Sequence, residues 1–453
     1  MFQVAIEGHK GGKSCRMAYD LVDVYDPETD ATSIARTTGY TCIIVARQVL
    51  NGPFTRKGIC PLEFVGRTTG CFEDLSAGYE TVWGLSRSGA LSGFAEPLKR
   101  LLRTSFTAHQ VCCPFLRRFA MSKLKAAVIG VGSMGSRHAR IYAELPETEL
   151  VGAVGATETN CVRIAARYGG RAYTDYEKML TTERPDLVSV AVPTVLHLEV
   201  AKAALAAGCH VLVEKPIADT VEAARALIVA AEAAERKLMV GHIVRFDPPI
   251  RALKQHMDAG ELGCLHQVVC RRIGPFPYRV QDVGVGLDLA PHDLDLLRYI
   301  TGEAPLSVYA ETTQRLHAEH EDLLTALLRF PSGVVGMLQL NWLTPTRARD
   351  VDVLGARGML RADCVGQTLT FFENGDVEGA MPTVEHGFRG VTVGRTIQFP
   401  LPREEPIRAE LAAFVAAVLN DTDVPVTGAD GLAALRLALA VVASGNERRL
   451  VEI

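Results

Sequence analysis

The chain has 453 residues, 48% of them hydrophobic and 22% charged, which is the balance of a globular protein with two to three domains and excludes a mainly disordered chain. Its formal net charge of −4 argues against a nucleic-acid or membrane-surface partner, and no apolar run reaches the roughly 18 residues of a membrane span. The 11 cysteines are scattered, without a CxxC pair or a Cys/His ligand cluster, so we expect reduced thiols, no metal site and a cytoplasmic location.

The first 120 residues differ from those that follow. Residues 1–75 contain three short motifs: Tyr25-Asp26-Pro27-Glu28-Thr29, Ala35-Arg36-Thr37-Thr38-Gly39-Tyr40 and Lys57-Gly58-Ile59-Cys60-Pro61-Leu62-Glu63. These motifs resemble the C-terminal part of saccharopine dehydrogenase-like or lysine 6-dehydrogenase proteins, whose own glycine loop would lie upstream. Residues 76–120 show little periodicity and are interpreted as a linker or an unsettled segment. Our hypothesis is that residues 1–120 are a fused remnant or a gene-model extension without catalysis of its own, because Met121-Ser122-Lys123 reads like a natural enzyme start.

Residues 121–242 alternate short apolar runs with helical patterns. Buried strands are predicted at residues 125–129, 150–154, 187–191, 211–213 and 238–240. Helices are predicted at residues 135–145, 197–207 and 221–236. This alternation is typical of a parallel sheet with helices on both faces, so we predict an α/β, Rossmann-type dinucleotide-binding domain.

Residues 243–453 show a different order of elements. Helices are predicted at residues 249–259, 287–299, 406–419 and 431–443, and strands at 323–330, 334–340, 350–354 and 368–372. Pro331-Ser332-Gly333 and Glu373-Asn374-Gly375-Asp376 are typical of hairpin turns. We therefore predict an α+β domain built on one large sheet.

A glycine-rich loop follows the first strand of residues 121–242 and opens a helix. In Gly130-Val131-Gly132-Ser133-Met134-Gly135, the first glycine permits the tight turn and the second lets the backbone approach a pyrophosphate. The third allows the helix to pack closely on the strand, and the helix N-terminus offers free N–H groups to the phosphates. The loop predicts dinucleotide binding; the alternative is a glycine turn that serves packing alone.

The position expected to bind the adenosine ribose departs from the usual pattern. An acid is expected at the end of the second strand, but Gly155 stands there and the next acid is Glu158. Thr157, Thr159 and Arg163 could accommodate a 2′-phosphate, or Glu158 and the backbone could hold the ribose. This departure weakens the case for NAD over NADP; we expect NAD, with NADP possible.

Two further segments follow strand ends, where ligands bind in parallel sheets. Glu214-Lys215-Pro216 places Lys215 where the nicotinamide should lie, and a lysine there can stabilise developing negative charge on a substrate oxygen. Val192-Pro193-Thr194-Val195-Leu196-His197 is expected to line the nicotinamide side, although His197 could simply begin its helix.

Asp288 and His292 are four residues apart, so the sequence places them on one face of the predicted helix over residues 287–299. An imidazole titrates near neutral pH and can take the proton of an alcohol, while a nearby carboxylate orients the substrate or the ring. We expect Asp293 and Asp295 to lie on the helix surface.

Together these motifs resemble the glucose-fructose oxidoreductase/inositol dehydrogenase/MocA family over residues 121–453. The resemblance implies an NAD(P)-dependent dehydrogenase of CH–OH groups, with a small-molecule substrate. It implies Lys215, Asp288 and His292 as the catalytic residues, with His292 as acid/base. It also implies that the sheet of the second domain packs at oligomer interfaces, hence a homodimer or homotetramer. The cofactor would be contacted by Gly130, Gly132, Ser133, Met134, Gly135, Pro193, His197 and Glu214.

A narrower resemblance, to UDP-N-acetylglucosamine 3-dehydrogenases, rests on residues 241–248, 271–277, 282–284 and 341–345. It implies oxidation of the sugar 3-hydroxyl to a 3-keto nucleotide sugar. Guanidinium groups suit phosphate, so Arg245, Arg272 and Arg279 are candidates to meet the substrate pyrophosphate; the alternative for each is a structural salt bridge. A free polyol such as inositol remains a second possible substrate, and a cofactor-sensing regulator is a third reading.

Overall fold

The computed structural model describes residues 2–10, 13–21, 123–277, 283–375 and 392–453. The chain divides into two units, Met1–Met121 and Ser122–Ile453. In the first unit, β1 (Phe2–Lys10) and β2 (Lys13–Leu21) form an antiparallel hairpin in which Phe2 lies opposite Leu21. The three motifs of residues 25–63 and the segment 76–120 lie outside the described residues.

Residues 124–241 form one six-stranded sheet in which every neighbouring pair is parallel. The strand order is β5-β4-β3-β6-β7-β8, so the chain starts in the middle and builds outwards in both directions. The strands are β3 (Leu124–Ile129), β4 (Thr148–Val154), β5 (Arg171–Tyr173), β6 (Leu187–Val190), β7 (His210–Glu214) and β8 (Leu238–Gly241). The helices between them are α6 (Ser133–Glu144), α7 (Glu158–Tyr168), α8 (Tyr176–Glu183), η1 (Thr194–Leu196), α9 (His197–Ala206) and α10 (Val221–Ala233).

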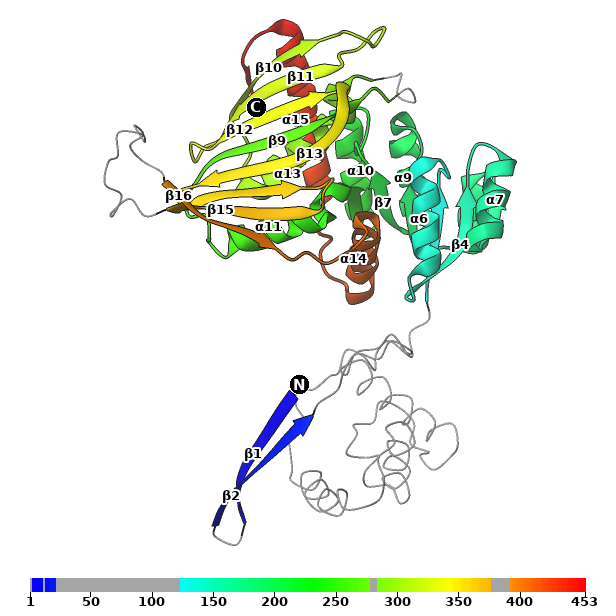
Figure 1. Cartoon of the computed structure of the whole chain (residues 1–453). Helices are drawn as coiled ribbons and strands as arrows, with labels where there is room; N and C mark the ends of the chain where they lie inside the picture. The colour runs from blue at the N-terminus through cyan, green and yellow to red at the C-terminus, as the bar shows by residue number, and fades with distance from the viewer. Residues whose placement is uncertain (1, 11–12, 22–122, 278–282, 376–391) are drawn as a thin grey trace, which may run out of the picture. The chain divides into compact units, whose positions relative to one another are not determined.

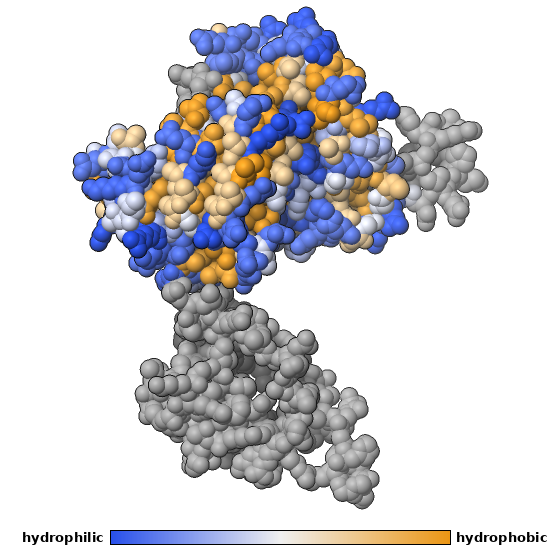
Figure 2. Space-filling view, turned by 180° about the vertical axis from the view of Figure 1, so that it is seen from behind, coloured by the Kyte–Doolittle hydropathy of each residue, from blue (hydrophilic) through white to orange (hydrophobic). Residues whose placement is uncertain are grey.

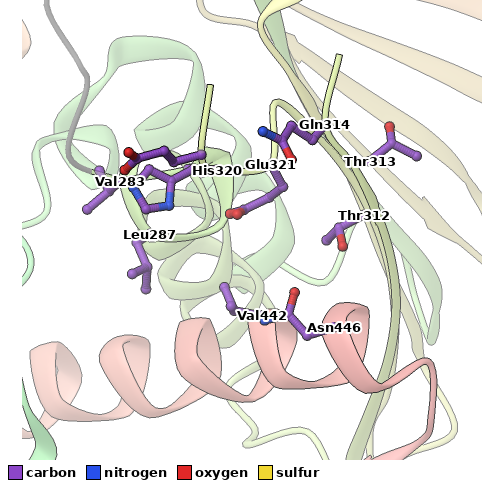
Figure 3. A pocket seen from close by; sticks show the side chains of 11 residues that line it. Val283, Leu287, Thr312, Thr313, Gln314, His320, Glu321, Val442 and Asn446 are labelled. Carbon is purple, nitrogen blue, oxygen red and sulfur yellow. The ribbon is translucent and has the colours of Figure 1, made fainter. Parts of the chain in front are cut away.

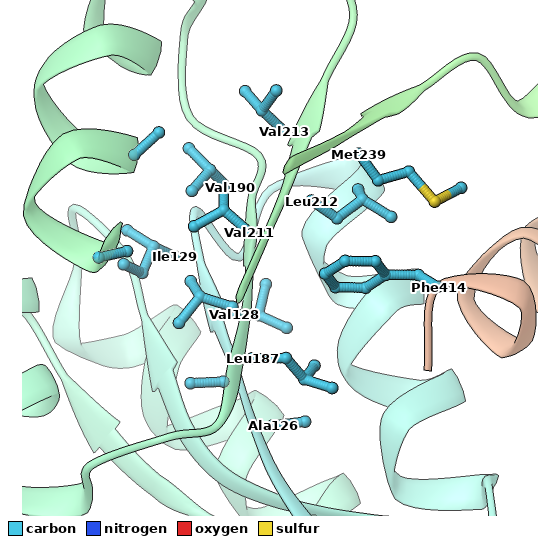
Figure 4. Close-up of a cluster of buried hydrophobic side chains, with 14 of the residues drawn as sticks. Ala126, Val128, Ile129, Leu187, Val190, Val211, Leu212, Val213, Met239 and Phe414 are labelled. Atoms are coloured by element: carbon cyan, nitrogen blue, oxygen red, sulfur yellow. The ribbon is translucent and has the colours of Figure 1, made fainter. Parts of the chain in front are cut away.

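The inner strands of this sheet are apolar along their length because both faces are covered. Every residue of β6 and β8 is buried, and Val211, Leu212 and Val213 of β7 have no exposed surface. Figure 4 shows Phe414 packed beside Leu212 and Met239 in the same cluster. Phe414 belongs to α14 (Pro406–Asn420), so a helix near the C-terminus completes the core around the six-stranded sheet.

The second sheet has nine strands in the order β16-β15-β14-β13-β9-β12-β11-β10-β17. All its neighbouring pairs are antiparallel except β9 and β12, which run parallel at its centre. The strands are β9 (Leu265–Pro275), β10 (Ser307–Thr313), β11 (Leu323–Arg329), β12 (Val335–Asn341), β13 (Leu343–Gly355), β14 (Gly358–Asp363), β15 (Thr368–Gly375), β16 (Thr392–Phe399) and β17 (Val451–Glu452).

Helices pack against one face of this sheet, as Figure 1 shows for α11 (Pro248–Asp258), α13 (Ala290–Thr301) and α15 (Gly428–Glu447). Among the described residues, α15 alone is long and apolar enough to cross a membrane by length and composition. Half of that stretch is buried, and α15 packs against α10, α13 and β10, so it is a core helix of this fold.

The other face of the nine-stranded sheet carries partly exposed apolar side chains. On β11 the residues alternate, with Leu324, Ala326 and Leu328 buried and Leu327 48% exposed. Val335 of β12 and Leu354 of β13 are also exposed. Figure 2 shows the opposite side of the molecule, seen from behind relative to Figure 1, where apolar residues also gather in bands between charged ones.

The predicted fold class is confirmed: a Rossmann-type sheet is followed by an α+β part built on one large sheet. Several details differ from prediction. The strands β5, β9, β10, β14, β16 and β17 had no predicted counterpart, and one predicted turn is partly wrong. The central strand β9 was not predicted, because its polar and apolar residues give no strong pattern in Leu265-His266-Gln267-Val268-Val269-Cys270-Arg271-Arg272. The predicted turn at residues 373–376 is wrong over its first three residues, since β15 continues to Gly375 and pairs with β16.

Candidate active site

The glycine loop has the geometry that a dinucleotide requires. Gly130 has φ +101°, and a Cβ there would lie 2.4 Å from the carbonyl oxygen of Ala191. A Cβ at Gly135 would lie 1.8 Å from the carbonyl oxygen of Gly130, so only glycine lets α6 approach the loop. Nothing lies within 4 Å of a Cβ built at Gly132, so this side of the loop is open. Because α6 has no side-chain cap, its first N–H groups are free to bind a phosphate, and the residues fit NAD.

The neighbouring strand ends bring the other predicted cofactor residues to the same edge of the sheet. Because β3, β6 and β7 are adjacent and parallel, the glycine loop, Pro193 and Lys215 follow strands that end side by side. Ser133 and Pro193 are exposed at this edge, and Met134 is half-buried. At the end of β4, Gly155 packs on Val131 of the glycine loop, and Thr157 is the N-cap residue of α7.

His197 ties two of these strand ends together. Its Nδ1 lies 2.9 Å from the carbonyl oxygen of Pro216 and its Nε2 lies 3.0 Å from that of Val192. Burial lowers the pKa of His197, although the two carbonyl groups oppose this shift. The side chain is buried and both ring nitrogens face backbone oxygens, so His197 holds the loops after β6 and β7 in place beneath the cofactor edge.

Glu214 of the Glu-Lys-Pro segment is buried against α6. Its Oε1 lies 3.1 Å from Nε2 of His138, which has no exposed side-chain surface, and its Oε2 accepts from the backbone N–H of Lys215. Burial alone would raise the pKa of Glu214, but His138 and the charge of Lys215 outweigh it and lower that pKa. Glu214 therefore joins the helix of the glycine loop to the backbone of Lys215. No sequence motif pointed to His138.

Lys215 and Asp288 meet, although 73 residues separate them. The Lys215 Nζ donates to the backbone oxygen of Asp288 at 2.8 Å and lies 3.3 Å from its Oδ1. That backbone oxygen is available because the N–H of His292 bonds instead to the carbonyl oxygen of Leu289. The contact holds the ammonium group of Lys215 beside the carboxylate of Asp288.

The helix predicted over residues 287–299 is broken at Leu289. Asp288 ends α12 (Val285–Asp288), and His292 lies in α13, whose second residue is Pro291. Proline has no N–H to continue the helix, which explains the break. Asp288 and His292 therefore do not share one regular helix face, and the prediction that they do is wrong.

His292 is half-buried, and its Nδ1 is buried without a hydrogen-bond partner among the described residues. Burial, followed by the positive charges of Lys215 and Arg272, holds the pKa of His292 well below its ordinary value of 6.5. The imidazole is therefore neutral at neutral pH, and a neutral imidazole can accept a proton.

Arg245 and Arg272 lie in buried ion pairs. Arg272 binds Asp293 through two nitrogens, at 2.9 and 2.7 Å, and Arg245 binds Asp295 in the same way, at 2.7 and 2.5 Å. Asp293 and Asp295 are 2% and 1% exposed, so the prediction that they lie on the helix surface is wrong. These pairs are the structural alternative that the sequence left open for the two arginines. Arg279 lies outside the described residues.

A pocket of about 380 Å³ lies beside α12. Figure 3 shows its lining side chains, which come from α12, the end of β10, the segment before β11 and the C-terminal half of α15. In its wall, Glu321 Oε1 accepts from the N–H of Gly286 at 2.9 Å. A Cβ at Gly284 would lie about 2.2 Å from this carboxyl group, so glycine leaves it room to hold the start of α12.

Comparison with known proteins gives matches within the second unit. Residues 124–242 match the family model described as oxidoreductase family, NAD-binding Rossmann fold, and residues 250–361 match the GFO/IDH/MocA C-terminal domain. The chain is 31% identical to a UDP-N-acetylglucosamine 3-dehydrogenase from Acidithiobacillus ferrooxidans, over 71% of this chain and 97% of that protein. The crystal structure of that enzyme superimposes with a TM-score of 0.64, covering 72% of this chain and 98% of that one.

Two further relatives carry different names. The chain is 27% identical to an inositol 2-dehydrogenase from Rhizobium meliloti, over 73% of this chain and 99% of that protein. An oxidoreductase from Agrobacterium radiobacter, solved with NAD+ and L-tartaric acid, shares 21% identity and a TM-score of 0.63. It covers 73% of this chain and 98% of its own, and at that identity it shows the fold alone.

Proposed function

Since this chain belongs to the GFO/IDH/MocA family of NAD-binding oxidoreductases, we propose that it oxidises the 3-hydroxyl of UDP-N-acetylglucosamine, or of a related nucleotide sugar, to a 3-keto sugar. The family and its members establish the coarser activity, an NAD-dependent dehydrogenase of sugar or polyol hydroxyl groups. The choice of substrate rests on the 31% identity to an enzyme that carries this name.

The pairing of Lys215 with Asp288, in which the charge of Lys215 also acts on the imidazole of His292, is the observation that carries the proposed chemistry. In this proposal His292 accepts the proton of the substrate hydroxyl, and the ammonium group of Lys215 polarises the hydroxyl oxygen. Asp288 holds Lys215 in position. Bound NAD supplies the hydride acceptor at the edge of the sheet, held by Gly130, Gly132, Ser133, Met134 and Gly135.

A spectrophotometric assay tests the substrate. The purified chain is given NAD or NADP with UDP-N-acetylglucosamine or with myo-inositol, and cofactor reduction is followed by absorbance. Turnover with the nucleotide sugar supports the proposal, whereas turnover with inositol alone contradicts it and keeps the family activity. The second candidate, a polyol dehydrogenase, is favoured by the 27% identity to the inositol enzyme over nearly its whole length. Tight cofactor binding without turnover of either compound would contradict both and favour a cofactor-sensing regulator.

We also propose a homo-oligomer in which two copies bury the uncovered face of the nine-stranded sheet. Leu327, Val335 and Leu354 are exposed on that face, 48%, 41% and 38% respectively, and such a row of apolar side chains suits burial against a partner. A cytoplasmic location is proposed because Cys161, Cys209 and Cys270 are buried free thiols.

A further inference from the structure

Arg245 and Arg272, which the sequence analysis proposed as partners of a substrate pyrophosphate, are already bound to carboxylates in the structure. Arg272 and Arg245 each bind a buried aspartate through two nitrogens, and Arg245 also faces Asp430. A guanidinium saturated in this way has little left to offer a phosphate, and breaking a buried pair is costly. The anionic part of a nucleotide sugar therefore needs other cations near His292.

Arg349 of β13 lies directly opposite Arg272 of β9 in the antiparallel pair. Side chains of opposite residues project from the same face of a sheet, and Arg272 reaches Asp293 on α13. Arg349 therefore points to the helix-covered face, on the side of the sheet where His292 lies. Further along β13 on this face, Val351 and Val353 are buried, whereas Arg349 is exposed, so it stands where the cover of the sheet ends.

Arg347 lies two residues before Arg349 on the same strand and is also exposed. The Arg347 Cγ is 3.8 Å from the position that a Cβ would take at Gly274. Within the described residues, neither Arg347 nor Arg349 has a carboxylate partner or a side-chain hydrogen bond. Burial and the charges of Arg272 and Arg347 lower the pKa of Arg349, and its charge in turn contributes to the lowered pKa of His292. Arg349 thus stands within electrostatic reach of the proposed base, and Arg347 lies close enough to Arg349 for its charge to act on it.

We propose that Arg349, together with Arg347, forms an anion-binding edge of the substrate site that takes the diphosphate of a nucleotide sugar. This inference rests on the proposed function. It assigns the binding of the substrate diphosphate to arginines of β13, whereas the sequence analysis proposed Arg245 and Arg272 for that role. Guanidinium groups bind phosphate oxygens through pairs of N–H donors, and both groups are free to do so. The sugar ring would then extend from this edge toward Lys215 and His292.

Binding of UDP to the NAD-saturated full chain tests the edge without requiring turnover. Isothermal titration should give a dissociation constant about 10- to 100-fold higher for Arg349→Gln than for the wild type, and a smaller increase for Arg347→Gln. Arg361→Gln is the matched control, because Arg361 is an exposed β14 arginine paired with Asp352, and its UDP affinity should stay unchanged. In turnover of UDP-N-acetylglucosamine, Arg349→Gln should raise KM by a similar factor and leave kcat within a few-fold.

The outcomes separate this inference from the proposed function. If Arg349→Gln and Arg347→Gln keep the UDP affinity of the wild type, and the nucleotide sugar is turned over normally, the anion-binding role of the two arginines is contradicted. The proposed function would still be supported. If the wild type turns over only inositol and does not bind UDP, inorganic pyrophosphate is titrated instead. Pyrophosphate binding that is lost in Arg349→Gln would then support an anion site for another phosphorylated substrate. If the wild type does not bind pyrophosphate, the proposal that Arg349 and Arg347 form an anion-binding site is contradicted.

Discussion

At the scale of single residues, His292 is expected to act as a base because its surroundings keep it neutral. Burial and the positive charges around it hold its pKa well below 6.5, so the base form persists as the pH falls below that value. For alcohol oxidation, the acid limb of the kcat/KM profile should therefore lie below the ordinary pKa of an imidazole.

The substitution His292→Asn should reduce kcat/KM about 100- to 10,000-fold and remove that acid limb, with NAD affinity unchanged. His266→Asn is the control, because His266 is an exposed residue of β9. Steady-state measurement of kcat/KM from pH 5 to 9 for the wild type and both variants tests this prediction. An acid limb that persists in His292→Asn would assign it to another group.

Glu410 of α14 is a buried carboxyl group that the proposed reaction does not use. It has no exposed surface, and both oxygens lack a hydrogen-bond partner among the described residues. Burial, followed by the negative charge of Glu214, raises the pKa of Glu410 well above 4.5. The folded protein therefore retains a proton that the unfolded chain releases, and this group's contribution to stability is lost as the pH rises from about 4.5 through the raised pKa.

Glu410→Gln should remove this component of the pH dependence. The free energy of unfolding of the wild type should fall relative to that of the variant as the pH rises above 4.5, with a limiting slope of about 1.4 kcal/mol per pH unit. Denaturant unfolding between pH 5 and 8 measures it, with Glu405→Gln at an exposed site as the control. Parallel profiles for the wild type and Glu410→Gln would show that Glu410 is ionised in the folded protein.

At the scale of elements, Gly132 and Gly135 have different roles in the strand–loop–helix unit from β3 to α6. Gly132→Ala meets no atom within 4 Å, so stability should be unchanged, while the added methyl group should weaken NAD binding by about 10-fold or more where the backbone meets the pyrophosphate. Gly135→Ala places a Cβ 1.8 Å from a backbone oxygen and should cost about 1–3 kcal/mol of stability. Thermal unfolding and NAD titration of both variants separate the two effects. Unweakened NAD binding by Gly132→Ala would contradict this assignment.

The junction of α12 and α13 is another element with a task in the site. The helix break before Pro291 leaves the backbone oxygen of Asp288 free to accept from Lys215. Glu321 holds the other end of α12 through the N–H of Gly286. The short helix is thus fixed at both ends, which positions the carboxylate of Asp288 beside the ammonium group of Lys215.

At the scale of the whole molecule, both described hydrophobic cores belong to the second unit. One core surrounds the six-stranded sheet, and the other surrounds the nine-stranded sheet. The described residues of both cores lie between Leu124 and the C-terminus. The two family models match residues 124–242 and 250–361, so we predict that a protein starting at Met121 keeps the thermal stability and kcat/KM of the full chain. Removal of the same residues by a protease would serve as a second preparation. An unstable or inactive protein from Met121, beside an active full chain, would contradict the prediction and give residues 1–120 a role.

Most of the dinucleotide-binding fold and the proposed catalytic set could be predicted from the sequence. The glycine loop, the Glu-Lys-Pro segment and the Asp288/His292 spacing depend on residues that are close together in the chain. The rule that parallel strands end at one edge then brings the glycine loop and Lys215 together. The helix boundary at Leu289 was within reach too, because Pro291 is visible in the sequence.

By itself, then, the sequence determined five of the six strands of the first sheet, three of the helices beside them and the residues at the ends of those strands, because hydrophobic periodicity and glycine geometry are local properties. The short strand β5 and the helices α7 and α8 were not predicted. Only the tertiary structure decided which charges are neutralised. Arg245 and Asp295 are 50 residues apart and Arg272 and Asp293 are 21 apart, and each pair becomes buried when separate elements pack. Arg349 stands beside Arg272 only because β13 pairs with β9. Charge pairing depends on distances in space, which the spacing of residues along a chain does not contain.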